Sequence, residues 1–111
     1  MKVKPMNKYV KLILSPILGD FSAISLCPLG IYIEKYDKYI VNHERIHWRQ
    51  QIEMLILPFY MWYLTELFIK RIYMNKRDAY LSLSFEKEAF KNQNNLDYLN
   101  KRKPYSWFKH F

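Results

Sequence analysis

Hydrophobic and polar positions change their spacing once along this chain. Between Tyr9 and Glu34, short runs rich in Ile, Val and Tyr are interrupted by Pro and Gly. Such runs, bounded by turn residues, predict two or three short antiparallel strands. The interrupting residues are Pro16, Gly19, Pro28 and Gly30. After Glu34 the apolar positions follow a helical period, so we expect helices in the rest of the chain.

The first expected helix has a polar stripe along one side. It begins near Asn42, a good N-cap residue, and runs until Pro58, which has no backbone N–H to continue the helical hydrogen bonds. Arg45, Arg49 and Glu53 recur every four residues on the solvent side. The apolar contacts are expected from Ile46, Ile52, Leu55 and Ile56.

A second helical segment, PFYMWYLTELFIKRIY, starts at Pro58 and is apolar nearly all round. Such a helix is either buried in the core or in contact with a membrane. The apolar stretch from Met54 to Ile69 covers sixteen residues, fewer than the roughly twenty that a spanning helix needs. Its aromatic residues and the Lys and Arg that follow resemble an interfacial belt. These residues are Tyr60, Trp62, Tyr63 and Tyr73, then Lys70, Arg71, Lys76 and Arg77.

A third helical region follows Asn75. Its best internal start is Ser84, a good N-cap residue, with Glu86 and Glu88 in the first turn, where the helix dipole favours carboxylates. We expect this helix to extend to about Asn100, and its apolar face to contain Phe85, Ala89, Leu96 and Leu99. The aromatic and basic tail PYSWFKHF either packs back on the core or touches a lipid surface.

Length, composition and charge narrow the class of protein. With 111 residues, half of them apolar, we expect one α+β domain over residues 1–111, with short antiparallel strands followed by three to four helices. The net charge of +8 favours anionic partners such as a membrane surface. Arg, the residue preferred for phosphate and base recognition, is scarce at 5 against 13 Lys, so nucleic acid is not an expected partner.

The single cysteine and the amino-terminal residues indicate the cellular location of the protein. Cys27 is the only cysteine, so no internal disulfide can form, which favours a reducing, cytoplasmic location. The amino end resembles a secretory signal, but its apolar stretch is short and is broken by Pro16. We therefore expect an unprocessed chain.

The candidate chemistry lies in NHERIHWRQQ, residues 42–51. His43 and His47 are four residues apart, so on a helix both imidazoles project from one face and can hold one zinc ion. Glu44 lies between them and is placed to accept a proton from water at the metal. This is the HExxH pattern of zinc-dependent peptidases. The alternative is two histidines that only share a helix face.

A third metal ligand must come from elsewhere, because catalytic zinc normally has three protein ligands and a water. Glu86 is the best candidate, since it opens a helix that can return antiparallel to the first. Glu66 follows His47 after eighteen residues, the spacing of the HExxH-x18-E aminopeptidases, but it lacks their Asn-Glu motif and can instead pair with Lys70 at i+4. Glu88, two positions after Glu86, would point elsewhere on the helix. Weaker candidates are His110 and Cys27.

The order HERIH, a long hydrophobic helix, and FEKEA about forty residues later resembles the core of gluzincin metallopeptidases. The most similar types are the CAAX prenyl protease and beta-lactam sensor families. The match covers about residues 40–92 and is specific at HExxH and weak at the glutamate helix. Those families place the third zinc ligand in a helix reading roughly Glu-x-x-Ala-Asp, which implies Glu86 as ligand with Ala89 in the alanine position. The chain also resembles the minigluzincins in its size and in its strands before the motif helix.

The resemblance implies a zinc cofactor, a peptide or protein substrate, and hydrolysis of peptide bonds. The implied roles are metal binding by His43, His47 and Glu86, and activation of water by Glu44. The resemblance also implies a strand near Ser22 to Leu26 whose edge pairs with an extended peptide.

One departure from the family pattern bears on activity. Phe90 stands where those families have an Asp that orients a zinc-bound histidine, and Asp97 is the remaining candidate for that role. This departure favours a first alternative, a catalytically inactive metal-binding protein. A second alternative is a small protein that associates with a membrane surface through its aromatic helix and basic tail. The oxyanion-stabilising residue stays open among ten tyrosines.

Overall fold

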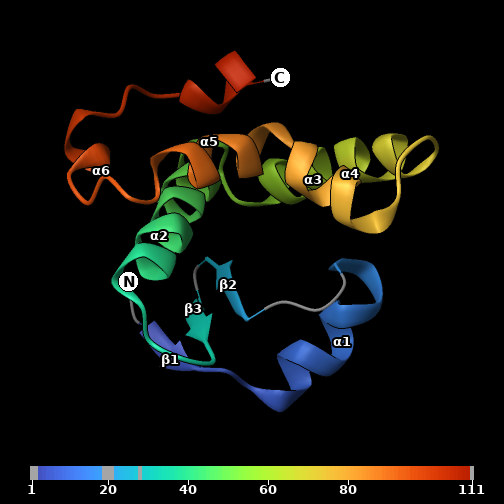
Figure 1. Ribbon diagram of the computed structural model, residues 1–111, viewed down its shortest axis with the longest axis horizontal. Coiled ribbons are helices and arrows are strands. Elements are labelled where there is room, and N and C mark those ends of the chain that lie inside the picture. The colour runs from blue at the N-terminus through green and yellow to red at the C-terminus, as the bar shows by residue number, and fades with distance from the viewer. Residues whose placement is uncertain (1–2, 19–21, 28, 111) are drawn as a thin grey trace.

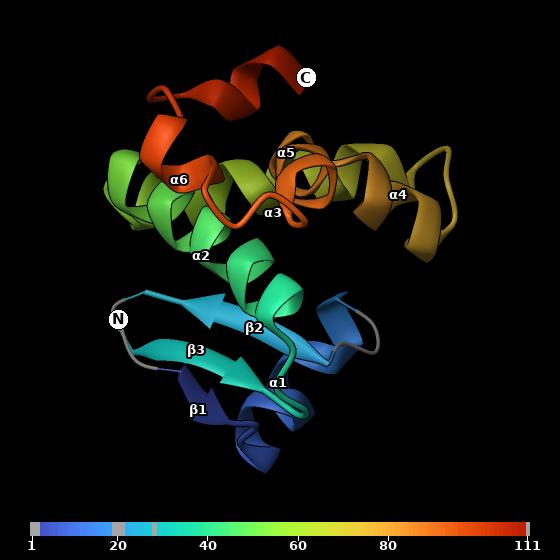
Figure 2. The ribbon, with the colours of Figure 1, turned by 60° about the vertical axis from the view of Figure 1, so that its left-hand side comes forward.

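The computed structural model describes residues 3–18, 22–27 and 29–110. A small sheet and one helix lie on one side of the molecule, and the remaining helices lie on the other (Figures 1 and 2). The elements of the amino-terminal part are β1 (Val3–Pro5), α1 (Lys8–Leu18), β2 (Ala23–Leu26) and β3 (Gly30–Ile33). Those of the helical part are α2 (Lys38–Glu53), α3 (Leu57–Arg71), α4 (Lys76–Ser82), α5 (Ser84–Asn92), α6 (Tyr98–Lys101) and the 3-10 helix η1 (Ser106–His110). The expected α+β class is confirmed.

The sheet differs in part from the expected one. Its strand order is β1-β3-β2; β2 pairs antiparallel with β3 as expected, whereas β1 pairs parallel with β3. A parallel pair needs a crossover connection, and α1 belongs to that connection. A strand beginning near Tyr9 was therefore the wrong expectation. The side chain of Asn7 caps this helix by accepting from the N–H of Tyr9 at 2.8 Å, and Val10 and Leu14 recur at helical spacing. The turns expected at Gly19 and Pro28 lie outside the described residues.

The motif helix α2 starts earlier and ends earlier than its sequence pattern suggested. Asp37, not Asn42, is the N-cap, and its carboxylate accepts from the backbone N–H groups of the first turn. At the other end the chain turns at Leu55 and Ile56, which both have positive φ. Pro58 lies in the first turn of α3, where a missing N–H is tolerated, so it does not mark the end of α2.

Side chains from two other helices fix both ends of α5. At its start Glu66 accepts from the backbone N–H and from the hydroxyl of Ser84, both at 2.8 Å, and Leu83 rather than Ser84 is the N-cap. At its end the amide of Asn42 donates to the carbonyls of residues 92, 93 and 95. These bonds take up carbonyls that a longer helix would use, so α5 stops well before the expected end near Asn100.

Two buried clusters of the core come from α3, α4, α5 and η1, and Ile31 of β3 and Ile46 of α2 are also fully buried. One buried cluster contains Phe59, Phe85 and Trp107, and a second contains Leu67, Ala79 and Leu83. Since Trp107 is buried, the aromatic tail packs back on the core, one of the two outcomes expected for it. The expected apolar contacts Ile52 and Leu55 are instead exposed.

Within the described part of the chain, no single helix has the length and apolar character to cross a bilayer. The pair α2 and α3 reaches that length together, but it is bent by 114° at the break between them.

Candidate metal centre

Three potential metal ligands converge between α2 and α5. His43 Nε2 lies 3.0 Å and His47 Nε2 2.9 Å from the same oxygen, Oε1 of Glu86, and the two nitrogens are 3.1 Å apart. Three ligands of a tetrahedral zinc, each at about 2.0–2.1 Å from the metal, stand about 3.3 Å from one another. The spacing therefore fits one small metal ion. All three side chains are buried.

Two glutamines orient the imidazoles from behind. Gln93 Oε1 lies 2.8 Å from Nδ1 of His43, and Gln50 Oε1 lies 2.7 Å from Nδ1 of His47. The amide orientation of Gln50 is fixed independently, because its Nε2 donates to the carbonyl of Phe85 and to Glu88. An amide oxygen can only accept, so each Nδ1 must carry the proton. Both Nε2 atoms then face Glu86.

The converging atoms require a positive charge between them. Two imidazole nitrogens and a carboxylate oxygen lie about 3 Å apart with their lone pairs directed at one another. These lone pairs repel unless a proton or a metal ion lies among them. Burial alone would lower the pKa of His47, but the negative charge of Glu86 and its hydrogen bond outweigh burial and raise that pKa to about 9. The same interactions overcome the burial of Glu86 and hold its pKa well below the usual value. Without metal, a proton on His47 supplies the charge at neutral pH.

Metal affinity should therefore depend steeply on pH. A metal ion can bind Nε2 of His47 only after that proton has left, and the proton is held up to a pKa of about 9. We expect the apparent zinc affinity to rise about tenfold per pH unit between about pH 6 and pH 8, because one proton is displaced. Competition with a chelator of known affinity at each pH measures this slope. An affinity independent of pH would mean that His47 is not a ligand.

Glu44 lies beside the three ligands but outside their group. It comes from α2, is buried, and lines the same pocket as His47 and Glu86. Burial raises the pKa of its carboxyl above the usual value, although the nearby imidazoles and a hydrogen bond from the backbone N–H of Ser25 act in the opposite direction. A bound divalent cation would further favour the charged carboxylate. This position suits a group that exchanges a proton with a water molecule.

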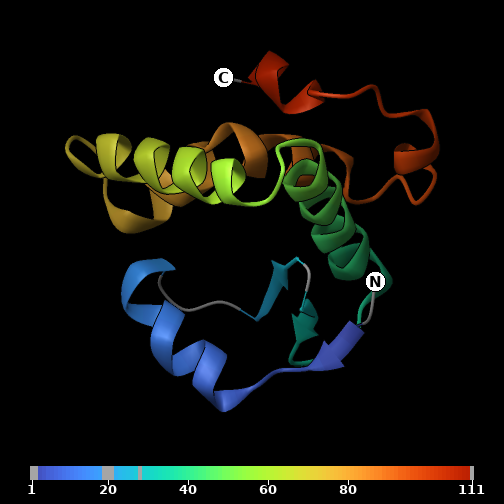
Figure 3. The same cartoon turned by 180° about the vertical axis from the view of Figure 1, so that it is seen from behind.

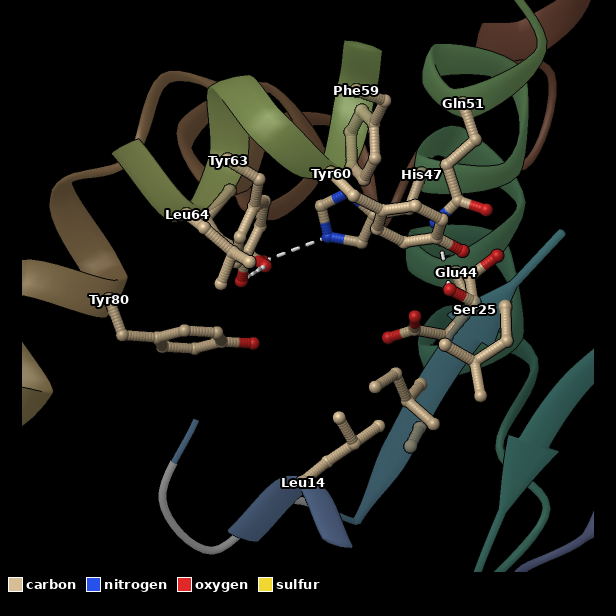
Figure 4. Close-up of a pocket in the computed structure, with 14 residues that line it drawn as sticks. Leu14, Ser25, Glu44, His47, Gln51, Phe59, Tyr60, Tyr63, Leu64 and Tyr80 are labelled. Carbon is tan, nitrogen blue, oxygen red and sulfur yellow. Dashed lines mark hydrogen bonds and ion pairs between the residues drawn. The ribbon is translucent and has the colours of Figure 1, made fainter. Parts of the chain in front are cut away.

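The pocket beside Glu44 is lined mostly by apolar and aromatic side chains (Figure 4). Besides α2 and α5, which carry Glu44, His47 and Glu86, its walls come from α1, β2, α3 and α4. Two tyrosines bring hydroxyl groups to it: Tyr63 donates to Oε2 of Glu86 at 2.8 Å, and Tyr80 points its hydroxyl into the pocket. Burial raises the pKa of both phenols, so they remain protonated donors.

The other acidic candidates have structural roles. Glu66 is not in the ligand group: it holds the start of α5 and pairs with Lys70 at 3.1 Å, the i+4 pairing expected as its alternative role. Glu88 is not in the group either. It is buried, accepts from Gln50 at 2.9 Å, and forms an ion pair with Arg102.

The weaker candidates also lie outside the ligand group. Neither His110 nor Cys27 joins it among the described residues. Asp97 is bonded to its neighbours Asn100 and Lys101 and so does not orient a histidine. Phe90, where the resembled families have an Asp, packs its ring edge-on against His43, with 4.4 Å between ring centroids.

Sequence reasoning missed the two orienting glutamines. Gln50 follows His47 by three residues, so a helical pattern could have placed it on the same side of α2. Gln93 lies just beyond α5, and no local pattern marks it. The orienting role expected of a carboxylate at position 90 is thus taken by the amide of Gln93, at the end of the same helix.

Comparison with known proteins gives no relative: no protein-family model, curated protein or solved structure matches the chain. The three donor atoms limit which metal ion can bind. Two imidazoles and one carboxylate with room for a further ligand bind zinc in hydrolases and ferrous iron in oxygenases. The group could hold either ion, and elemental analysis of the purified protein distinguishes them.

Proposed function

We propose that this protein is a zinc-dependent peptidase whose metal is held by His43, His47 and Glu86. The observation that carries the proposal is the convergence of these three ligands beside a fourth buried group, Glu44, at the wall of a pocket. A purely structural cluster needs no second carboxylate placed this way. The HExxH spacing and its likeness to the gluzincins support the same assignment.

The chain's own residues would divide the reaction between them. A zinc ion bound there would polarise the scissile carbonyl and lower the pKa of its water toward ~7. Glu44 accepts the proton of the attacking water as the new C–O bond forms and then returns it to the amide nitrogen, after which the peptide C–N bond breaks and the amine leaves. Gln50 and Gln93 keep both Nε2 atoms directed at the metal position.

Tyr80 is our candidate for the group that stabilises the oxyanion. Its hydroxyl points into the pocket, and its raised pKa keeps the proton available for donation. Both hydroxyls interact with Glu86, but Tyr63 donates to its Oε2 at 2.8 Å and so contributes to placing that ligand, which makes Tyr63 less suited.

The strand edge expected to pair with a peptide is β2, which lines the pocket. Part of that edge is already bonded to α2: Gln51 donates to the carbonyl of Ser25 and accepts from the N–H of Cys27, both at 2.8 Å. Peptide pairing along this edge stays a prediction. If it occurs, it would involve the part of β2 before Ser25.

The test is metal analysis combined with a peptide-cleavage assay on the wild-type chain and His47→Ala. We expect about one zinc per wild-type chain. In His47→Ala the affinity should fall by more than the roughly 10–100-fold that losing an outer hydrogen-bond partner costs, and cleavage should disappear. His110→Ala is the matched control, since the third histidine lies outside the group and its loss should leave both readouts unchanged. Iron in place of zinc, or equal metal content in both variants, would contradict the proposal.

A metal-binding protein without turnover is the second candidate. The observation that favours it is that two neutral amides, not carboxylates, accept from the ligand imidazoles. Loss of a carboxylate partner typically lowers metal affinity or activity about 10–100-fold, so amide partners favour a centre that keeps its three ligands but is poorly tuned for turnover. Stable zinc binding without any detectable cleavage would support this candidate.

A further inference from the structure

One face of α3 is apolar and turned away from the core. Its members are each more than half exposed: Leu57, Met61, Phe68, Ile69 and Ile72. Figure 3 shows α3 running across the near side of the molecule with no other segment over it. Large apolar side chains gathered on one exposed surface are typical of an interaction site.

The helical geometry places these side chains together. At 3.6 residues per turn they fall within an arc of about 120°, and no charged residue of α3 lies inside it. The charged residues Glu66 and Lys70 lie on another side of the helix and bind Ser84 and the carbonyl of Ser82. The exposed arc thus carries no charge, and its one polar side chain, Thr65, donates its hydroxyl to the carbonyl of Met61 at 2.7 Å.

Basic residues lie at one end of this face. Arg71, in the last turn of α3, and Lys76 and Arg77, at the start of α4, are all exposed. The chain carries a net charge of +8. Two copies of such a chain repel each other, whereas an anionic surface attracts each one.

We propose that the exposed face of α3 docks on an anionic lipid surface. The fifteen residues of α3 measure about 22 Å, less than the roughly 30 Å of a bilayer's hydrocarbon core, so the helix lies in the plane of the interface. The apolar side chains enter the boundary between headgroups and acyl chains, and Arg71, Lys76 and Arg77 contact the headgroups. This inference goes beyond peptide hydrolysis and does not depend on it.

The pocket lies next to this face. Tyr60, Tyr63 and Leu64, on the adjoining side of α3, line the pocket that contains Glu44. A docked molecule would thus hold its pocket close to the lipid surface.

The test is sedimentation of the full-length protein with phosphatidylcholine vesicles that contain or lack phosphatidylserine. We expect binding to the anionic vesicles that weakens with salt. The double variant Phe68→Ser, Ile72→Ser should lower the partition constant at least about tenfold, since two exposed apolar side chains no longer enter the lipid. The triple variant Arg71→Gln, Lys76→Gln, Arg77→Gln should lower binding to anionic vesicles by a similar factor.

The matched control is Tyr36→Ser, Leu96→Ser, which removes two exposed apolar side chains outside α3 and should bind like wild type. Far-UV circular dichroism confirms that each variant is folded. Two results would overturn the proposal: no binding of wild type to anionic vesicles, or a homodimer in light scattering that Phe68→Ser, Ile72→Ser dissociates. The second would show that another copy of the chain covers this face.

Discussion

Replacing Glu44 with glutamine should lower kcat/KM for peptide cleavage by about 10²–10⁴ while zinc stays bound. Glutamine keeps the size of the side chain and removes its ability to take a proton. Metal content should not change, because Glu44 is not among the three converging ligands. The measurement is kcat/KM on a peptide that wild type cleaves, together with zinc per chain.

Glu34→Gln is the matched control for this substitution. Glu34 is another glutamate, more than a third exposed and paired with Lys11, and it does not line the pocket. Its variant should retain wild-type activity. A general base contributes about 10²–10⁴-fold to the rate. If Glu44→Gln kept more than about a tenth of the activity, the loss would be too small for a general base, and the proton acceptor would have to be another group.

Some residues of the metal centre could be predicted from the sequence and others could not. His43 and His47 are four residues apart on one helix, so their convergence follows from helical geometry alone. Glu86 is thirty-nine residues from His47, and only its place in a helix start and the family resemblance singled it out. Gln93 reaches His43 from beyond the end of α5, and no periodic pattern marks such a residue.

Helix boundaries were the weakest of the sequence expectations, for a related reason. Asn42 has the side chain of an N-cap, but its amide is used at the far end of α5, where three carbonyls accept from it. Glu66 looked like a ligand by spacing, yet it caps α5 and so supports the helix that carries Glu86. Both polar side chains serve a partner distant in sequence, which a local rule cannot anticipate.

Glu88 also has a partner distant in sequence that a local rule cannot anticipate. It connects the metal site to the carboxyl end of the chain. Arg102 forms ion pairs with Glu88 and with Glu53, and its guanidinium is almost wholly buried. Glu88 in turn accepts from Gln50, which holds Nδ1 of His47. A chain of contacts thus runs from Arg102 through Glu88 and Gln50 to His47. The charges of Arg102 and Glu88 therefore help to orient this metal ligand.

Replacing Arg102 with methionine should lower the free energy of unfolding by about 3–5 kcal/mol. The substitution keeps an unbranched, mostly apolar stem but leaves Glu88 and Glu53 without their cation, and a buried carboxylate without a partner is costly. Arg102 lowers the pKa of Glu88 against the effect of burial, so the stabilisation is present at neutral pH and is lost as the pH falls through that lowered pKa. Urea unfolding of the metal-free chain at neutral and at acidic pH measures both effects.

Arg102→Lys separates charge from geometry in this network. Lysine keeps the positive charge but cannot bind both oxygens of Glu53 with two nitrogens, as the guanidinium does at 2.9 and 2.8 Å. We expect a smaller loss of stability than for methionine. Zinc affinity should also fall in Arg102→Met, by up to about 10–100-fold, because Gln50 loses its anchored partner and holds His47 less firmly. If methionine cost less than about 1 kcal/mol and left zinc affinity unchanged, the ion pairs would contribute no more than exposed ones do, and the metal ligands would be held by α2 and α5 alone.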